Sequence, residues 1–167
     1  MASTAVVDLY LARERVRGEI PVGAFSRVSD LLNSGVSVFV GGRALMIAGP
    51  SPAGADGWMI SSADFAIPLS AIRLVVPVVE PPRDAVPAGL RHEREPLPAT
   101  LGVEEWHVSG ILHLLDRVHW ADFLASAQGK FIPVSGATIR YGDTSASVEA
   151  DFALINGSRI TALFVDP

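Results

Sequence analysis

The chain has no cysteine and a single lysine, Lys130, among its 13 basic residues. Without cysteine there is no disulfide, no thiol nucleophile and no thiolate metal ligand, and the redox compartment stays open. The formal net charge is −5, whereas a general nucleic-acid binder needs a basic face that releases counterions from phosphates. These absences argue against thiol chemistry and make nucleic acid a disfavoured partner.

Long apolar runs are also missing. The longest, residues 74–79, is far shorter than the roughly 20 residues that span a bilayer, and the first residues lack the basic start and apolar run of a signal peptide. We therefore expect a cytoplasmic protein without membrane insertion. Hydrophobic residues nevertheless make up 49% of the 167 residues and charged residues only 19%, which predicts a globular chain with a large core.

Prolines are concentrated near the middle of the chain. Half of the twelve lie in one stretch: Pro77, Pro81, Pro82, Pro87, Pro96 and Pro98. Proline has no amide donor and resists regular strand pairing. We predict an extended linker over 77–98 that separates a first unit, 5–76, from a second unit, 99–166.

The two predicted units share residues at a constant spacing. Five positions recur 92 residues later: Val16, Gly18, Asp30, Leu32 and Phe39 as Val108, Gly110, Asp122, Leu124 and Phe131. A further match, 64–67 with 151–154, is displaced by 87 positions, which predicts a shorter loop in the second unit. The spacing indicates a tandem duplication.

Hydrophobic periodicity predicts that both units are mainly β. Apolar residues alternate with polar ones over 16–22 and 106–114, which is typical of half-buried strands. A short helix is expected around 28–34, ended by Gly35, and its counterpart at 119–124 ends near Gly129. Gly41 and Gly42 predict a tight hairpin turn between strands 36–40 and 43–47.

The size of each unit predicts how the two are combined. A domain of about 70 residues buries only about 60% of its unfolded surface and is marginal alone. We expect the units to pack on each other about a pseudo-twofold axis, sharing part of a core, as in a homodimer joined into one chain. Packing of each unit onto another chain in a larger assembly is the alternative.

The order of features resembles small, strongly bent β-barrels, with a distant similarity to Sm-like domains. The resemblance is carried by Val16-Arg17-Gly18-Glu19-Ile20, by Asp30-Leu31-Leu32-Asn33, and by the late strand-turn-strand of residues 152–160. The segment 27–33, with its Arg-x-Ser-Asp-x-Leu-Asn pattern, also resembles the signature of an uncharacterised bacterial β-domain family. The resemblance implies two tandem Sm-like repeats and no activity. The short helix expected in each unit lies between its second and third strands, where ordinary Sm-like domains have none.

No motif in the chain predicts catalysis, a cofactor or a metal. There is no Gly-x-Ser-x-Gly elbow, and the Gly-rich stretch 49–57 lacks the lysine of a phosphate loop. Asp30 and Asp122 are best explained as helix-start residues, with a carboxylate pair across the axis as the alternative. His113 and His119, with Asp116 nearby, are only a weak metal pattern that the first unit does not repeat.

The candidate binding residues are arginines. Arg13, Arg15 and Arg17 lie on one face of the predicted opening hairpin, where a solvated surface is the default and an anionic partner the alternative. Arg27, the first residue of the Arg-x-Ser-Asp-x-Leu-Asn segment, is the fourth candidate. The repeated positions Gly18, Asp30, Phe39, Gly110, Asp122 and Phe131 are assigned structural roles.

These patterns favour a non-enzymatic protein-binding or assembly module, in which two fused β units present strand edges to a protein partner or to further copies. Two alternatives remain open. One is a ligand- or nucleotide-sensing regulator with a pocket between the units, and the other is an Sm-like RNA-binding protein that uses Arg13, Arg15 and Arg17.

Overall fold

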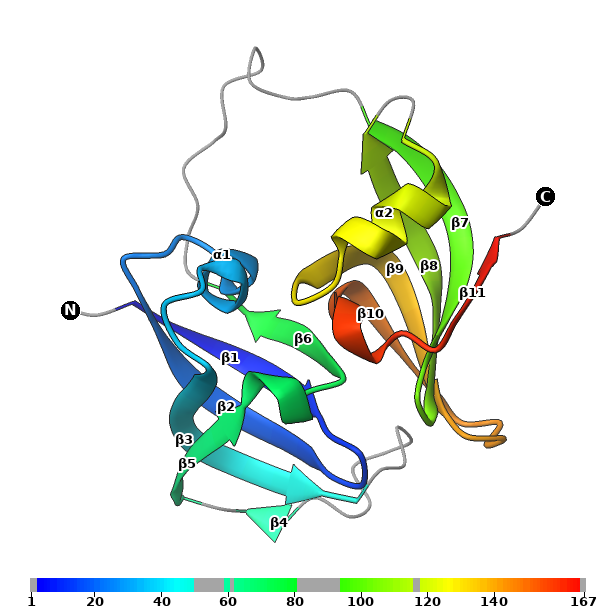
Figure 1. Ribbon diagram of the computed structural model, residues 1–167. Helices are drawn as coiled ribbons and strands as arrows, with labels where there is room; N and C mark the ends of the chain where they lie inside the picture. The colour runs from blue at the N-terminus through cyan, green and yellow to red at the C-terminus, as the bar shows by residue number, and fades with distance from the viewer. Residues whose placement is uncertain (1–2, 50–58, 61, 81–93, 116–117, 166–167) are drawn as a thin grey trace.

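In the computed structural model, residues 3–49, 59–60, 62–80, 94–115 and 118–165 are described. They form one mainly antiparallel β structure with two short α-helices (Figure 1), so the prediction of a mainly β chain is confirmed. The strands are β1 (Ser3–Tyr10), β2 (Arg15–Gly23), β3 (Phe39–Ala48), β4 (Met59–Ile60), β5 (Asp64–Pro68), β6 (Leu74–Val79), β7 (Arg94–Val103), β8 (Trp106–Leu115), β9 (Phe131–Tyr141), β10 (Ser147–Asn156) and β11 (Ala162–Val165). The helices are α1 (Val28–Asn33) and α2 (Trp120–Ser126), with 3₁₀ turns η1 (Leu69–Ala71) and η3 (Gly157–Arg159).

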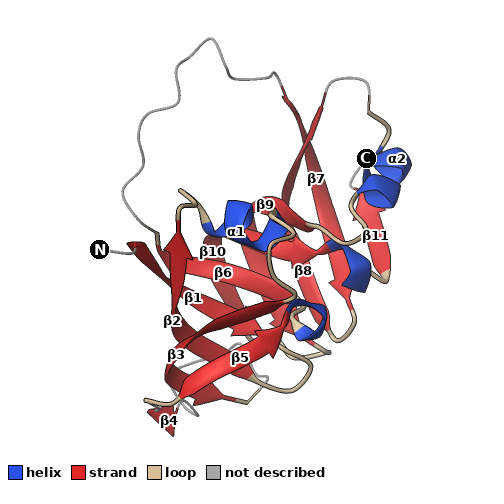
Figure 2. Ribbon diagram, turned by 60° about the vertical axis from the view of Figure 1, so that its left-hand side comes forward, coloured by secondary structure: helices blue, strands red, loops and turns tan. Residues whose placement is uncertain are grey.

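The strands pair in the same order in two halves. In the first half, β1 to β6, the order is β6-β1-β2-β3, with β5 and β4 both paired to β3. In the second half, β7 to β11, the order is β11-β7-β8-β9-β10. Strand β10 pairs with β6 and joins the halves into one continuous sheet, and Figure 2 shows these two strands side by side.

The pairing registers of the two halves also correspond. Val16 pairs with Ile47, and Val108 pairs with Ile139, so both members are displaced by 92 positions. Beyond β3 the displacement differs from the prediction. Phe39 pairs with Pro68 and Phe131 with Asn156, which places β5 and β10 88 positions apart rather than 87. Because a shift of one residue reverses the face that a side chain occupies, the segments 64–67 and 151–154 are not equivalent in the sheet.

The repeated glycines of β2 and β8 lie at matching irregularities. The β2–β3 register shifts between Arg17 and Gly18, and the β8–β9 register shifts across Gly110. A Cβ on Gly18 would lie 2.6 Å from the Phe65 ring, and one on Gly110 would lie 2.6 Å from Val134 Cγ1. Glycine therefore permits the close strand packing at these bulges.

The predicted turn at Gly41 and Gly42 is wrong, because β3 runs through both residues without interruption. A Cβ on Gly42 would lie 2.3 Å from the Glu19 carbonyl oxygen, so the glycine serves a close approach of β3 to β2. The strand also begins later than predicted, at Phe39, and leaves Val36 and Val38 exposed before it.

Strands extend into both ends of the predicted linker. Pro77 lies in β6 opposite Val7, and Pro96 and Pro98 lie in β7. Strand β11 pairs with β7 only from Ala99 onward. The amide donors that Pro96 and Pro98 lack would therefore face no partner strand. The remaining prolines of the predicted linker (Pro81, Pro82 and Pro87) lie outside the described residues, as do residues 50–57 of the Gly-rich loop.

Both predicted helices are present. Gly35 follows α1 and Gly129 follows α2 with φ of 69° and 75°, the left-handed conformation that glycine adopts most readily. Asp30 and Asp122 each lie in the first turn of their helix, where a carboxylate favours the helix dipole.

Each half contributes side chains to the hydrophobic core of the other. Tyr10, Leu74 and Val76 from the first half pack in the core of the second half, while Phe131 and Leu154 from the second pack in the core of the first. The predicted sharing of a core is thus observed. The pseudo-twofold axis is not confirmed: it would require β5 to pair with β11 as β10 pairs with β6, and the described β5 and β11 pair instead with β3 and β7.

Candidate functional site

Several side-chain hydrogen bonds of the described chain cross the contact between the two halves. Its backbone pairing is short, with Leu154 opposite Val75 and Ile155 opposite Leu74. Two residue pairs are few for a sheet junction, because strands in globular proteins usually pair over about five residues. Side chains from both halves therefore complete the junction.

Two asparagines bind backbone across the junction. The Asn156 side chain is buried and donates to the carbonyl oxygens of Leu69 (3.2 Å) and Ile72 (2.8 Å). Its backbone N–H donates to the carbonyl oxygen of Arg73 (2.9 Å). From the other side, Asn33 of α1 donates to the Phe131 carbonyl oxygen (2.9 Å) and accepts from its N–H (2.7 Å). Both amides thus replace strand pairing that the short β6–β10 ladder does not supply.

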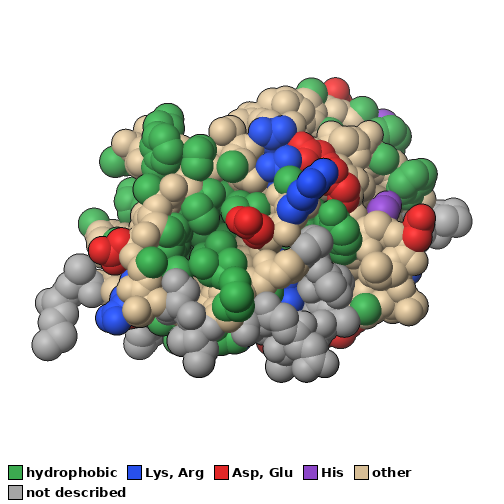
Figure 3. Space-filling model, turned by 90° about the horizontal axis from the view of Figure 1, so that it is seen from below, with side chains coloured by type: hydrophobic (Ala, Val, Ile, Leu, Met, Phe, Trp, Pro, Cys, Tyr) green, Lys and Arg blue, Asp and Glu red, His purple; other side chains and the backbone are tan. Residues whose placement is uncertain are grey.

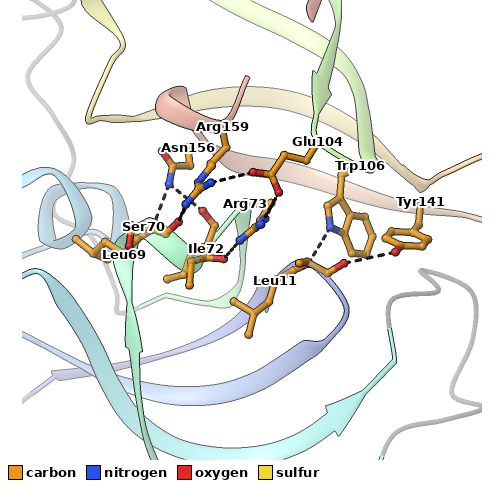
Figure 4. Close-up of polar contacts among 12 residues, drawn as sticks. Leu11, Leu69, Ser70, Ile72, Arg73, Glu104, Trp106, Tyr141, Asn156 and Arg159 are labelled. Atoms are coloured by element: carbon orange, nitrogen blue, oxygen red, sulfur yellow. Dashed lines mark hydrogen bonds and ion pairs between the residues drawn. The ribbon is translucent and has the colours of Figure 1, made fainter. Parts of the chain in front are cut away.

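A carboxylate with two arginines lies beside Asn156 (Figure 4). Glu104, in the turn between β7 and β8, accepts from Arg73 Nε at 2.6 Å and from Arg159 Nη1 at 3.0 Å. Arg159 Nε also donates to the Ser70 carbonyl oxygen, at 2.9 Å. Since Arg73 belongs to the first half and the other two charged groups to the second, this cluster ties η1 to the β7–β8 turn.

Trp106 anchors the opposite end of the junction. Its ring is fully buried, its Nε1–H donates to the Leu11 carbonyl oxygen at 2.9 Å, and it meets Tyr10 edge to face at a centroid distance of 4.9 Å. Tyr141 packs on its other side at 4.8 Å and donates to the Ala12 carbonyl oxygen (Figure 4). Burial, and secondarily the charge of Asp8, raises the pKa of Tyr10.

The residues that build the junction were not predicted from the sequence, and a comparison of the two halves would have found them. At the observed displacements the matching positions in the other half carry short or apolar side chains. The pairs are Asn33 with Ala125, Arg73 with Thr161, Glu104 with Ala12, Asn156 with Pro68, and Arg159 with Ala71. A long polar residue in one half opposite a short or apolar residue in the other half is the signal.

The outer strands expose apolar side chains at positions that the junction buries. Phe131 at the start of β9 is 4% exposed, whereas Phe39 at the start of β3 is 50% exposed. Val76 in β6 is 8% exposed, whereas its register equivalent in β11, Phe164, is 62% exposed. Figure 3, seen from below, shows hydrophobic side chains gathered over the first half.

The predicted arginine cluster is largely engaged within the fold. Arg15 is buried, with its guanidinium 5.9 Å from the centre of the Tyr10 ring. Arg17 forms two hydrogen bonds with Asp8, at 2.6 and 2.7 Å, and these bonds raise its pKa. Arg13 is exposed in the β1–β2 turn. The structure therefore places two of the three in intramolecular contacts.

Arg27 lies in a cleft between the halves. A cavity of about 390 Å³ is lined by Arg27 and Asp30 at the start of α1 and by Arg94, His113 and Phe152 from the second half. Of the candidate binding residues, Arg27 is thus the one that faces both halves.

The histidines do not form a metal site within the described residues. His113 Nε2 is 3.0 Å from Ser135 Oγ, and His119 Nδ1 accepts from the Ala121 N–H as the cap of α2. Asp116 lies outside the described residues. No group of three potential metal ligands occurs in the described part of the chain, and no helix there is long and apolar enough to cross a membrane.

No protein-family model, curated protein or solved structure matches the chain.

Proposed function

We propose that this protein is a non-enzymatic assembly module, built from two fused copies of a small bent β unit, which joins further copies of itself through strand edges. The equal pairing registers of the two halves support the duplication, as do the bulges at Gly18 and Gly110. Repeated units of this kind bury their apolar edges against a neighbour.

The junction inside the chain supplies the rule for joining units. It pairs β10, the counterpart of β5, with β6, the counterpart of β11. Such a contact between different surfaces is heterologous, and each added unit leaves the same two surfaces free at the ends. We therefore replace the predicted twofold relation with a head-to-tail one, in which β5 of one molecule accepts β11 of the next.

The observation that carries this proposal is the difference in exposure between equivalent residues. Phe131 and Val76, at the inner junction, are 4% and 8% exposed. Phe39, which lies opposite Pro68 of β5, and Phe164, which lies in β11, are 50% and 62% exposed. Large apolar side chains exposed at, or next to, strand edges that have no partner among the described residues favour association by strand addition.

The outer contact is expected to be weaker than the inner one. The inner junction contains Asn33, Glu104 and Asn156, and the corresponding outer positions are Ala125, Ala12 and Pro68. A contact without these bonds, between separate molecules, also loses translational and rotational freedom. Association should accordingly be reversible and depend on concentration.

The test uses one charged residue at each outer edge. Phe39→Lys places a charge on the apolar surface beside β5, and Phe164→Lys places one on the apolar surface of β11, so that each variant loses one contact surface. Because both positions are exposed, both variants should fold. In sedimentation velocity the unmodified chain should associate with rising concentration, and each variant alone should remain a monomer. An equimolar mixture should form a heterodimer, since each variant retains the surface that the other lacks.

The matched control is Ile111→Lys, an exposed apolar residue on the inner strand β8, which should associate like the unmodified chain. If the unmodified chain stays monomeric at every concentration, self-assembly is refuted. Association of either charged variant alone, or failure of the mixture to form a heterodimer, would refute the head-to-tail arrangement.

A further inference from the structure

The cleft at Arg27 is continuous with cavities on both sides. On one side it shares Arg27, Ser29 and Phe152 with a cavity of about 350 Å³ that is also lined by Glu80 and Asp151. The 390 Å³ cavity shares Arg94 and His113 with a second cavity of about 290 Å³ that lies against α2, beside Phe123 and Lys130. In Figure 1, α1 covers the first half and α2 the second. The 390 and 290 Å³ cavities form a groove that runs from one helix to the other along β8 and β9, and each cavity is close to the size range of small-molecule sites, about 300–1,000 Å³.

Basic side chains gather along this groove although the chain is acidic. Arg27, Arg94 and Lys130 line the 390 and 290 Å³ cavities together with His113, against one carboxylate, Asp30. Two further carboxylates, Glu80 and Asp151, lie in the adjoining 350 Å³ cavity. The formal net charge of the whole chain is −5, so the 390 and 290 Å³ cavities have a charge balance opposite to that of the molecule. A concave wall of one sign concentrates ligands of the opposite charge.

The cations of the groove are available for a ligand. The side chains of Arg27, Arg94 and Lys130 make no hydrogen bond or ion pair with any residue that the structure describes, unlike Arg17, Arg73 and Arg159. The His113 ring, in contrast, is held by Ser135 at 3.0 Å. The groove thus combines two arginine forks suited to oxyanions with one oriented imidazole.

The remaining surface of the groove is apolar. Phe152 and Pro133 line the part next to α1, and Phe123 and Ile132 line the part next to α2. An inorganic anion would not contact these apolar side chains. A ligand with a charged group and a hydrophobic body would contact both kinds of surface.

We propose that this groove binds a small organic anion, a carboxylate or a phosphate carried on an apolar body. The oxyanion lies between Arg94, Arg27 and His113, and the apolar body lies on Phe152 and Pro133. The site is built by both halves, because Arg27 comes from the first and the other groups from the second. It does not depend on self-assembly, so the two proposals stand or fall separately.

The test is calorimetric titration of the full chain with four probes: phenyl phosphate, benzoate, inorganic phosphate and benzyl alcohol. Phenyl phosphate or benzoate should bind more tightly than inorganic phosphate, which lacks the apolar body, and than benzyl alcohol, which lacks the charge. The stronger of the two distinguishes a phosphate from a carboxylate ligand. Replacing one arginine, in Arg94→Gln or Arg27→Gln, should weaken that binding about tenfold.

The matched control is Arg140→Gln, which removes the same charge from an exposed position at the far end of β9. Its affinity for the probe should equal that of the unmodified chain, and thermal unfolding should confirm that all three variants are folded. Binding of none of the probes, equal binding of benzyl alcohol, or equal losses in Arg94→Gln and Arg140→Gln would overturn the proposal.

Discussion

The inner junction and the two outer edges are formed by corresponding strands, yet they have very different surfaces. At the junction Phe131 is buried and its backbone is bonded to Asn33; at the outer edge its counterpart Phe39 is half exposed. The same aromatic residue is therefore core in one half and surface in the other. The difference teaches that the environment of a repeated residue depends on whether a neighbouring unit covers it.

Truncating the two phenylalanines tests this comparison with the largest expected effect. Phe131→Ala should lower the free energy of unfolding by about 3–5 kcal/mol, because it leaves a cavity in a closed core. Phe39→Ala should lower it by about 1 kcal/mol or less, since half of that ring already contacts water. Urea unfolding below the concentration of association measures both values. Equal losses would mean that the two positions are not differently covered.

The repeated glycines give the next largest difference. Gly110→Ala should cost about 1–3 kcal/mol, because the new Cβ would lie 2.8 Å from the Ser135 carbonyl oxygen as well as against Val134. Gly18→Ala should cost less, because the atoms nearest its Cβ belong to the half-buried ring of Phe65, which has room to move. Urea midpoints of the two variants decide the order, and a larger loss for Gly18→Ala would contradict it.

The carboxylate of the junction should have a smaller effect. Glu104→Asn removes the charge that pairs with Arg73 and Arg159 but keeps a residue that tolerates the φ of 56° found there. The expected loss is about 1–2 kcal/mol, reduced by the partial exposure of Glu104 to solvent.

Glu105→Gln, at the exposed neighbouring position in the same turn, is the control and should leave the thermal midpoint unchanged. If both variants unfold at the same temperature as the unmodified chain, the charge cluster does not stabilise the junction.

The smallest expected effect concerns Tyr10, which packs against Trp106. Its pKa is raised above the ordinary value of 10.0 mainly by burial, so the folded chain retains a proton that the unfolded chain releases. Stability from this group is complete below pH 10.0 and is lost as the pH rises through the raised pKa. Tyr10→Phe should make the alkaline decline of the urea midpoint shallower, and an unchanged decline would exclude Tyr10 as its source.

Local patterns predicted much of the fold. Alternating residues in β2 and β8, the short helices, and the glycines that follow them were all identified, because they depend on neighbours along the chain. The Gly41–Gly42 turn was wrong because glycine has two uses, and only the approach of β2 to β3 decided between a turn and a close contact. Likewise, the predicted linker is longer than the segment between β6 and β7, because a strand tolerates proline where the proline nitrogen faces no partner strand.

The candidate site was predicted less well for the same reason. Arg15 and Arg17 look solvated in an alternating pattern, but folding buries the first and pairs the second with Asp8. Of the predicted binding residues, Arg27 reached a cleft between the halves, and its neighbours Arg94 and His113 come from distant positions. No local spacing relates these residues.

Composition and periodicity were enough to determine a mainly β chain, since these properties depend on residue type and short-range order. The tertiary structure alone decided the one-residue change of register in β5 and β10, the pairing of β10 with β6, and the partners of each arginine. Those outcomes depend on competition between surfaces far apart in the chain. The free energy that separates them is a sum over contacts that exist only after both halves have folded.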